Sequence, residues 1–89
     1  MTVLRRWQAT IVDEAGNVQP AATVTVRHTA TGNLVTTLKS NRAGTGGLSN
    51  PVTADANGFA FFYVAGGRYD ITATKGAFSR TWTDVAIGT

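Results

Sequence analysis

The chain has 89 residues, no cysteine and a formal net charge of +3. A chain of this length forms one domain, here residues 1–89, that buries about 60–65% of its unfolded surface, and no disulfide can reinforce so small a core. The lysines and arginines are spread over separate segments rather than gathered in one block, so we expect no nucleic-acid partner. No apolar run approaches the roughly 20 residues that cross a bilayer, so we expect no membrane partner.

Two further features of the sequence indicate the compartment in which the chain folds. The lack of cysteine suits a reducing compartment. The segment after Arg5 and Arg6 alternates apolar and polar residues instead of forming the continuous apolar stretch of a signal peptide. Both observations predict a soluble chain made in a cytoplasm.

Apolar and polar residues alternate with a period of two, which predicts strands and no helix. In the first strand, Trp7, Ala9 and Ile11 share one face, and Arg6, Gln8 and Thr10 share the other. The predicted strands cover residues 6–11, 22–28, 34–40, 59–65, 69–75 and 78–87. We therefore expect an all-β fold, a single Greek-key sandwich of about seven short antiparallel strands of prealbumin-like or immunoglobulin-like type.

Turn residues separate these strands. Asp55 and Gly58 lie in "ADANG", where the carboxylate is expected to accept backbone N–H groups and the glycine to adopt a positive φ. Gly67 lies in the next turn, "GGR". Residues 41–51 form the longest irregular stretch, with Leu48 expected to reach the core. Asp70 is expected to point outward and to pair with Arg68 or Arg80.

The sequence offers little chemistry. His28 is the only histidine, and it lies on the apolar side of its strand, so we interpret it as a hydrogen-bonded residue at the rim of the core. It has no cysteine or second histidine with which to bind zinc. Counting twelve residues from Asp55 gives Gly66 instead of the glutamate of a calcium loop. We expect no catalytic residue, no metal, no cofactor and no enzymatic activity.

The segment "FAFFYV" is apolar on both faces, with Phe59, Phe61 and Tyr63 on one and Phe62 and Val64 on the other. A half-solvated antiparallel strand normally alternates apolar and polar residues. The second face is therefore covered, either by Trp7, Trp82 or the 41–51 loop, or by another subunit. The candidate interface residues are Phe62, Val64 and Trp82, with Arg5 and Arg6 at the rim. On that hypothesis Phe62→Ser weakens assembly more than it weakens the fold.

The order of these motifs resembles a small prealbumin-like or carboxypeptidase-regulatory-like sandwich module of tailed-phage structural proteins. The residues that carry the resemblance are Leu48, Asn50–Pro51, Asp55, Gly58, Phe59 to Tyr63, Gly67 to Ile71 and Trp82, preceded by a hairpin pattern over residues 12–38. One enzyme family of this fold, the transthyretin-like hydroxyisourate hydrolase, uses several histidines and a C-terminal "YRGS"-like tail. This chain has one histidine and ends in "VAIGT", so the resemblance does not extend to that activity.

The resemblance implies a virion protein or module, made in the host cytoplasm, that attaches a tail fibre, head fibre or spike or decorates the capsid. Its partners would be other virion proteins and copies of itself, with a trimer as a plausible assembly. The alternative is a carbohydrate-binding module for a host-surface glycan, with Trp7, Trp82 or Tyr63 as the aromatic platform. In that case the chain itself would attach the virion to the host surface.

Overall fold

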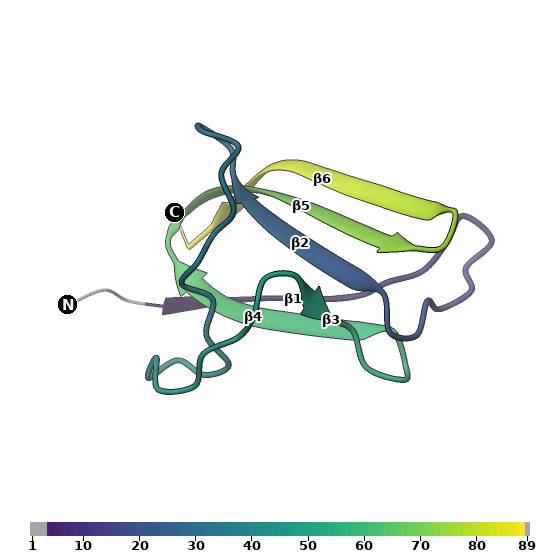
Figure 1. Ribbon diagram of the computed structural model, residues 1–89, viewed down its shortest axis with the longest axis horizontal. Coiled ribbons are helices and arrows are strands. Elements are labelled where there is room, and N and C mark those ends of the chain that lie inside the picture. Colours follow the sequence, from purple (N-terminus) through teal and green to yellow (C-terminus); the bar gives the residue numbers. More distant parts are fainter. Residues whose placement is uncertain (1–3, 89) are drawn as a thin grey trace.

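The computed structural model of the chain describes residues 4–88 as two antiparallel β-sheets stacked face to face. Figure 1 shows β2, β5 and β6 in one layer and β1 and β4 in the other. Within the described residues there is no helix. The predicted all-β sandwich is therefore confirmed.

The smaller sheet pairs β1 (Leu4–Thr10) with β4 (Phe59–Ala65), and the larger has the order β3-β2-β5-β6. Strands that pair are often distant in sequence, because the chain repeatedly crosses from one layer to the other. The larger sheet contains β2 (Thr23–His28), β3 (Val52–Thr53), β5 (Gly67–Lys75) and β6 (Phe78–Ile87).

The strand predicted at residues 34–40 is wrong, since this segment makes only isolated bridges at Leu34 and Lys39. Val35 and Leu38 are both buried, while Thr36 and Thr37 between them are exposed. Two inward residues three positions apart do not fit a period of two. The segment is bent to bury both side chains, which removes it from regular pairing.

The Asn50 side chain takes the place of a neighbouring strand beside β2. Its Oδ1 accepts the Val26 N–H at 3.1 Å, and its Nδ2 donates to the carbonyl oxygens of Val26 at 2.7 Å and Val35 at 2.8 Å. The peptide bond from Asn50 to Pro51 is cis. One amide thus satisfies three backbone groups beside a strand that β3 pairs over only two residues.

The core contains the inward faces of both sheets. Its largest fully buried side chains are Phe62, Ile11, Leu38, Ile71, Val24, Val26, Val35 and Val64. The predicted inward faces of residues 7–11 and 69–73 are confirmed, with Leu48 packed against the core as expected.

Phe62 and Val64 are 0% exposed, which corrects their assignment as surface contacts. They belong to the face of β4 that packs against the larger sheet, and the uncovered face is the one that carries Phe59, Phe61 and Tyr63. A side chain with no exposed surface cannot meet a partner without opening the sandwich.

Glycines allow β4 to cross directly into β5. A side chain on Gly66 would approach the Gly88 carbonyl oxygen to 3.2 Å, and one on Gly67 would approach the Tyr69 hydroxyl to 3.3 Å. The Tyr69 hydroxyl donates to the Ala65 carbonyl oxygen at 2.6 Å, and burial raises the pKa of this phenol. The neutral hydroxyl therefore ties the two sheets together at the crossing.

Asn50→Ala is expected to lower the free energy of unfolding by about 2–3 kcal/mol, because the Val26 N–H and the Val35 carbonyl lose this partner and the Val26 carbonyl keeps only the Val35 N–H. Urea unfolding followed by tryptophan fluorescence measures the change. Asn57→Ala, at an exposed turn position, is the control and should stay within about 0.5 kcal/mol of the parent. Equal losses in the two variants would contradict this role of Asn50.

Phe62→Ala is expected to cost about 3–5 kcal/mol, since it empties a fully buried site. Phe61→Ala on the opposite face of the same strand should cost about 1 kcal/mol, because that ring is already partly in water. Paired urea titrations of the two variants compare them directly. A larger loss for Phe61→Ala would contradict the assignment of the two faces.

Candidate functional site

The outer face of the β1–β4 sheet carries an aromatic row on which no further sheet or helix stacks within residues 4–88. Leu48, Val52 and Thr53 border Phe59 and Phe61 in a small pocket at the edge of the row. Phe59, Phe61 and Tyr63 lie on this face, each half-buried. The register places Thr10, Gln8 and Arg6 directly opposite them on β1, and these three are exposed. We call these three aromatic side chains, together with Arg6, the aromatic face.

The aromatic side chains are in contact along the strand. The ring centroids of Phe59 and Phe61 are 6.3 Å apart, and those of Phe61 and Tyr63 are 6.4 Å apart in an edge-on arrangement. The Arg6 guanidinium lies 4.6 Å from the Phe61 centroid and 5.8 Å from the Tyr63 centroid. It also donates a long hydrogen bond of 3.4 Å to the Tyr63 hydroxyl. These contacts hold the row in one arrangement before any partner arrives.

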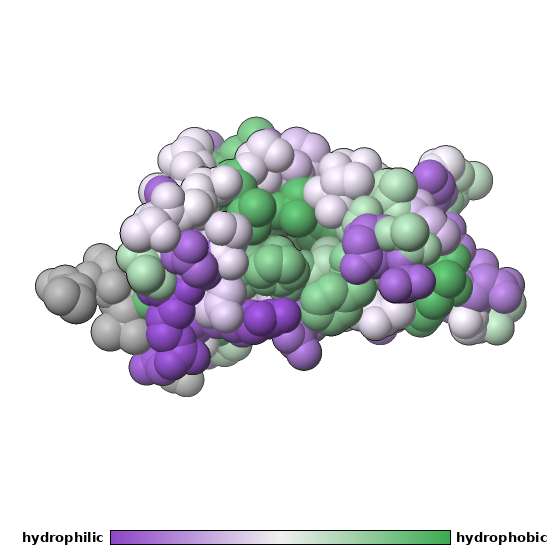
Figure 2. Space-filling view, turned by 90° about the horizontal axis from the view of Figure 1, so that it is seen from below, coloured by the Kyte–Doolittle hydropathy of each residue, from purple (hydrophilic) through white to green (hydrophobic). Residues whose placement is uncertain are grey.

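Lys39 lies on the far side of Tyr63 from Arg6. Its backbone exchanges hydrogen bonds of 2.9 and 2.8 Å with Tyr63, which extends the sheet by one residue beyond β4. Directly paired residues share a face of the sheet, so Tyr63 lies between two cations. Figure 2, seen from the side of β1 and β4, shows hydrophobic side chains in the middle of this surface with hydrophilic ones toward the N-terminal end.

The other proposed interface residues lie elsewhere. Trp82 is half-buried and meets Trp7 edge-on at 5.7 Å, and Trp7 stacks on Phe62 at 5.2 Å. Trp7 and Trp82 therefore close the core at the side where β1 and β6 face each other. Arg5 lies against Gly88, away from Arg6. The structure thus brings Arg6 to the aromatic face and does not bring Arg5 or Trp82 to it.

The sequence offered one signal for the correct face of β4. A tyrosine prefers to keep its hydroxyl near water, and Tyr63 shares its side of the strand with Phe59 and Phe61. Lys39 could not have been found, because it joins the site through a loop contact.

The turn before β4 is organised by Asp55. Its Oδ1 accepts the N–H groups of Asn57 at 2.8 Å and Phe59 at 3.0 Å, and Gly58 has a φ of 75°. Gly58 is buried, and a Cβ at this position would come within 3.1 Å of the Ile11 carbonyl oxygen and 3.2 Å of the Gln19 backbone nitrogen. Gly67 does not have a positive φ; its role is the close approach to Tyr69.

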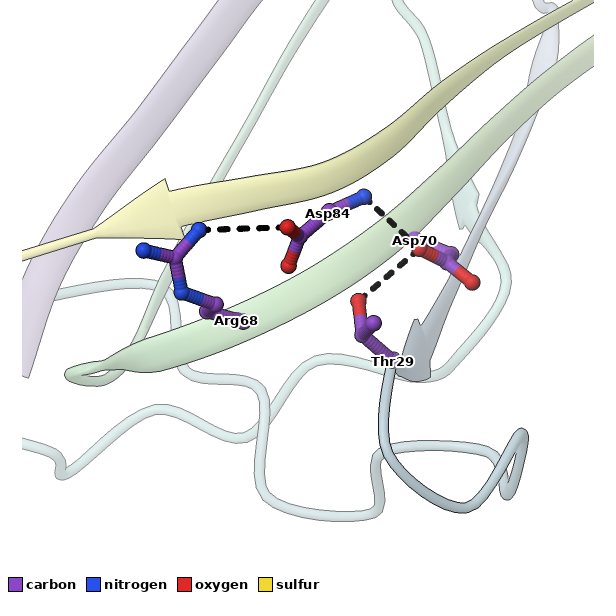
Figure 3. A network of polar contacts seen from close by, with 4 residues as sticks. All are labelled: Thr29, Arg68, Asp70 and Asp84. Atoms are coloured by element: carbon purple, nitrogen blue, oxygen red, sulfur yellow. Dashed lines mark hydrogen bonds and ion pairs between the residues drawn. The ribbon is translucent and has the colours of Figure 1, made fainter.

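A second polar cluster surrounds Asp70 (Figure 3). Its Oδ1 accepts the backbone N–H of Asp84 at 2.9 Å and the Thr29 hydroxyl at 2.8 Å. Asp84 has a φ of 55° at a bulge between β5 and β6, and its carboxylate pairs with Arg68 at 3.2 Å. The expected pairing of Asp70 with an arginine is therefore wrong, because the bulge offers Asp70 a backbone donor instead.

These hydrogen bonds lower the pKa of Asp70, chiefly through the Asp84 N–H and secondly through the Thr29 hydroxyl. Both donors are fixed by the bulge and the end of β2, so the cluster is structural. His28 is exposed at the end of β2, with its ring 5.6 Å from that of Tyr69. His28 therefore lies against the core residue Tyr69 from the solvent side.

Within residues 4–88, no group of three His, Asp or Glu side chains is placed to hold a metal ion. Nor is there, in the same residues, a helix long and apolar enough to span a membrane.

Comparisons with protein-family models, curated proteins and solved structures found no match to this chain.

Asp70→Asn is expected to reduce the loss of stability in acid. A carboxylate whose pKa is lowered by folding stabilises the protein above its unfolded pKa, and that contribution is lost as the pH falls through the folded pKa. Urea unfolding between about pH 5 and pH 2 should therefore give a shallower slope for the variant. Glu14→Gln, at an exposed loop position, is the control. Parallel slopes for the parent and Asp70→Asn would contradict the prediction.

Proposed function

We propose that this chain is a non-enzymatic structural protein or module of a tailed-phage virion and that it works by docking to other virion proteins. The observation that carries the proposal is the aromatic face, three contiguous aromatic side chains on the outside of a two-stranded sheet. The order and spacing of the sequence motifs support the phage assignment. In the virion, this module would attach a fibre or spike or decorate the particle.

The aromatic face has the composition of an interface centre. Aromatic and arginine side chains are enriched at protein contacts, where they contribute large areas with little loss of side-chain entropy. The row is already held by contacts with Arg6, so docking orders few further groups. A stable contact of this kind buries on the order of 800 Å² per partner.

The charges favour a partner with an acidic rim. Arg6 and Lys39 flank Tyr63, and Arg42 is exposed in the loop that follows Lys39. Two copies docked by this face would bring like charges together, which disfavours the contact. We therefore assign the aromatic face to a different virion protein, and contacts between copies, including those of a trimer, to other surfaces.

The glycan alternative, with Trp7, Trp82 or Tyr63 as the aromatic platform, has weaker support. Trp7 and Trp82 pack against each other, with the Arg80 guanidinium 4.7 Å from the Trp82 centroid. The Tyr63 ring has Arg6 beside it. None of the three presents a free flat ring of the kind on which a sugar stacks.

Phe61→Ser is expected to weaken docking while leaving the fold intact. The assay measures binding of the purified chain to particles that lack it, prepared from the phage that carries the gene with this gene deleted. Affinity should fall at least about tenfold, the loss typical of an aromatic residue at the centre of an interface. The matched surface control is Gln8→Ser, because Gln8 lies on β1 directly opposite Phe61 and on the same face of the sheet.

Two results would overturn the proposal. The first is absence of the chain from wild-type particles by mass spectrometry. The second is binding of Phe61→Ser with the parent's affinity, once its melting temperature shows that it is folded.

A further inference from the structure

A groove lies at one end of the sandwich and shares no lining residue with the aromatic face. It has a volume of about 650 Å³ and is lined by Val12 to Ala15 from the loop after β1 and by Ala77 to Arg80 from the β5–β6 turn and the start of β6. This volume is within the range of about 300–1,000 Å³ that small-molecule sites occupy. The two walls come from opposite ends of the sequence and meet only in the folded chain.

Both walls are held in place. Asp13 Oδ1 accepts the N–H groups of Ala15 and Asn17, each at 2.9 Å, and its Oδ2 accepts Gln19 Nε2 at 3.2 Å. On the other side, Lys75 pairs with Phe78 across a two-residue turn in which Gly76 has a φ of 57°. The groove is therefore formed without a ligand.

The lining combines an apolar surface with two available charges. Phe78 is half-buried against the core, and Val12, Ala15 and Ala77 add apolar surface. Glu14 and Arg80 are exposed on opposite walls. The pair of Arg68 with Asp84 is the one ion pair found within residues 4–88, so Glu14 and Arg80 do not pair with each other.

The opposite charges of the two walls disfavour a ligand that carries a net charge. A net positive ligand is repelled by Arg80, and a net negative one is repelled by Asp13 and Glu14. Glu14 offers acceptors only and Arg80 offers donors only, whereas a hydroxyl group both donates and accepts. A ring with hydroxyl groups at its edge and C–H groups on its face therefore matches both walls and the apolar lining.

We propose that this groove binds a neutral saccharide. The C–H face of the sugar ring lies against Phe78, one hydroxyl donates to the Glu14 carboxylate, and another accepts from the Arg80 guanidinium. Neither Trp7 nor Tyr63 takes part. The site is separate from the aromatic face, so docking to a virion protein and saccharide binding do not depend on each other.

The test is an NMR titration of the ¹⁵N-labelled full chain with glucose, galactose, mannose, N-acetylglucosamine and N-acetylgalactosamine. At least one sugar should shift the amide signals of Ala15, Ala77 and Ser79, with a Kd on the order of 1 mM. Glucosamine and glucuronate, as a cation and an anion, should bind at least about tenfold more weakly than the neutral sugar. Methyl glycosides distinguish a sugar within a glycan chain from a free sugar as the natural ligand. Binding equal to that of the free sugar indicates a sugar within a glycan chain, and loss of binding indicates a free sugar.

Variants test whether the shifted amide signals report binding in the groove. Glu14→Ala and Arg80→Ala should each weaken binding about tenfold, the loss expected for a hydrogen bond to a charged group. Arg42→Ala, an exposed arginine outside the groove, should bind like the parent. Because Arg80 also packs on Trp82, Glu14→Ala is the deciding variant, since it leaves this contact in place.

Three results would overturn the proposal. They are the absence of any shift with all five sugars up to about 50 mM, shifts outside the groove, and unchanged binding in folded Glu14→Ala.

Discussion

Burial of one face of β4 against the four-stranded sheet is the contact on which the rest of the structure depends. A two-stranded sheet is marginal in water by itself, so β1 and β4 are stable only because Phe62 and Val64 are buried with residues of β2 and β5. Trp7 extends this contact by stacking on Phe62. Because the described residues contain no cysteine to form a disulfide, the packing of these side chains holds the two sheets together.

The burial of one face of β4 also determines which side chains lie on its outer face. A strand that is buried on one face must present its alternate residues on the other, and in β4 these are Phe59, Phe61 and Tyr63. The partner strand supplies polar residues opposite them, and the bend that buries Val35 and Leu38 leads directly to Lys39 beside Tyr63. An aromatic row with a positive end is thus a consequence of how the core is filled.

Polar side chains bond to backbone groups at places where regular strand pairing is interrupted. Asn50 supplies hydrogen bonds beside β2, and Asp70 holds the backbone of Asp84 at the bulge in β6. Asp13 organises the loop that forms one wall of the groove. Each of these polar side chains bonds to backbone groups, so these Asx positions contribute to the fold.

Period-two alternation alone determined the all-β class, the strands at both ends of the chain and the inward faces of β1 and β5, because each of these strands has one clearly apolar side. Alternation could not orient β4, whose two sides are both apolar, and it missed the bend at residues 34–40, where burial follows a spacing of three. Only the tertiary structure decided that Phe62 faces inward, that Lys39 joins Tyr63, and that Glu14 and Arg80 share a groove. Each of these depends on contacts between segments far apart in sequence, which local periodicity does not encode.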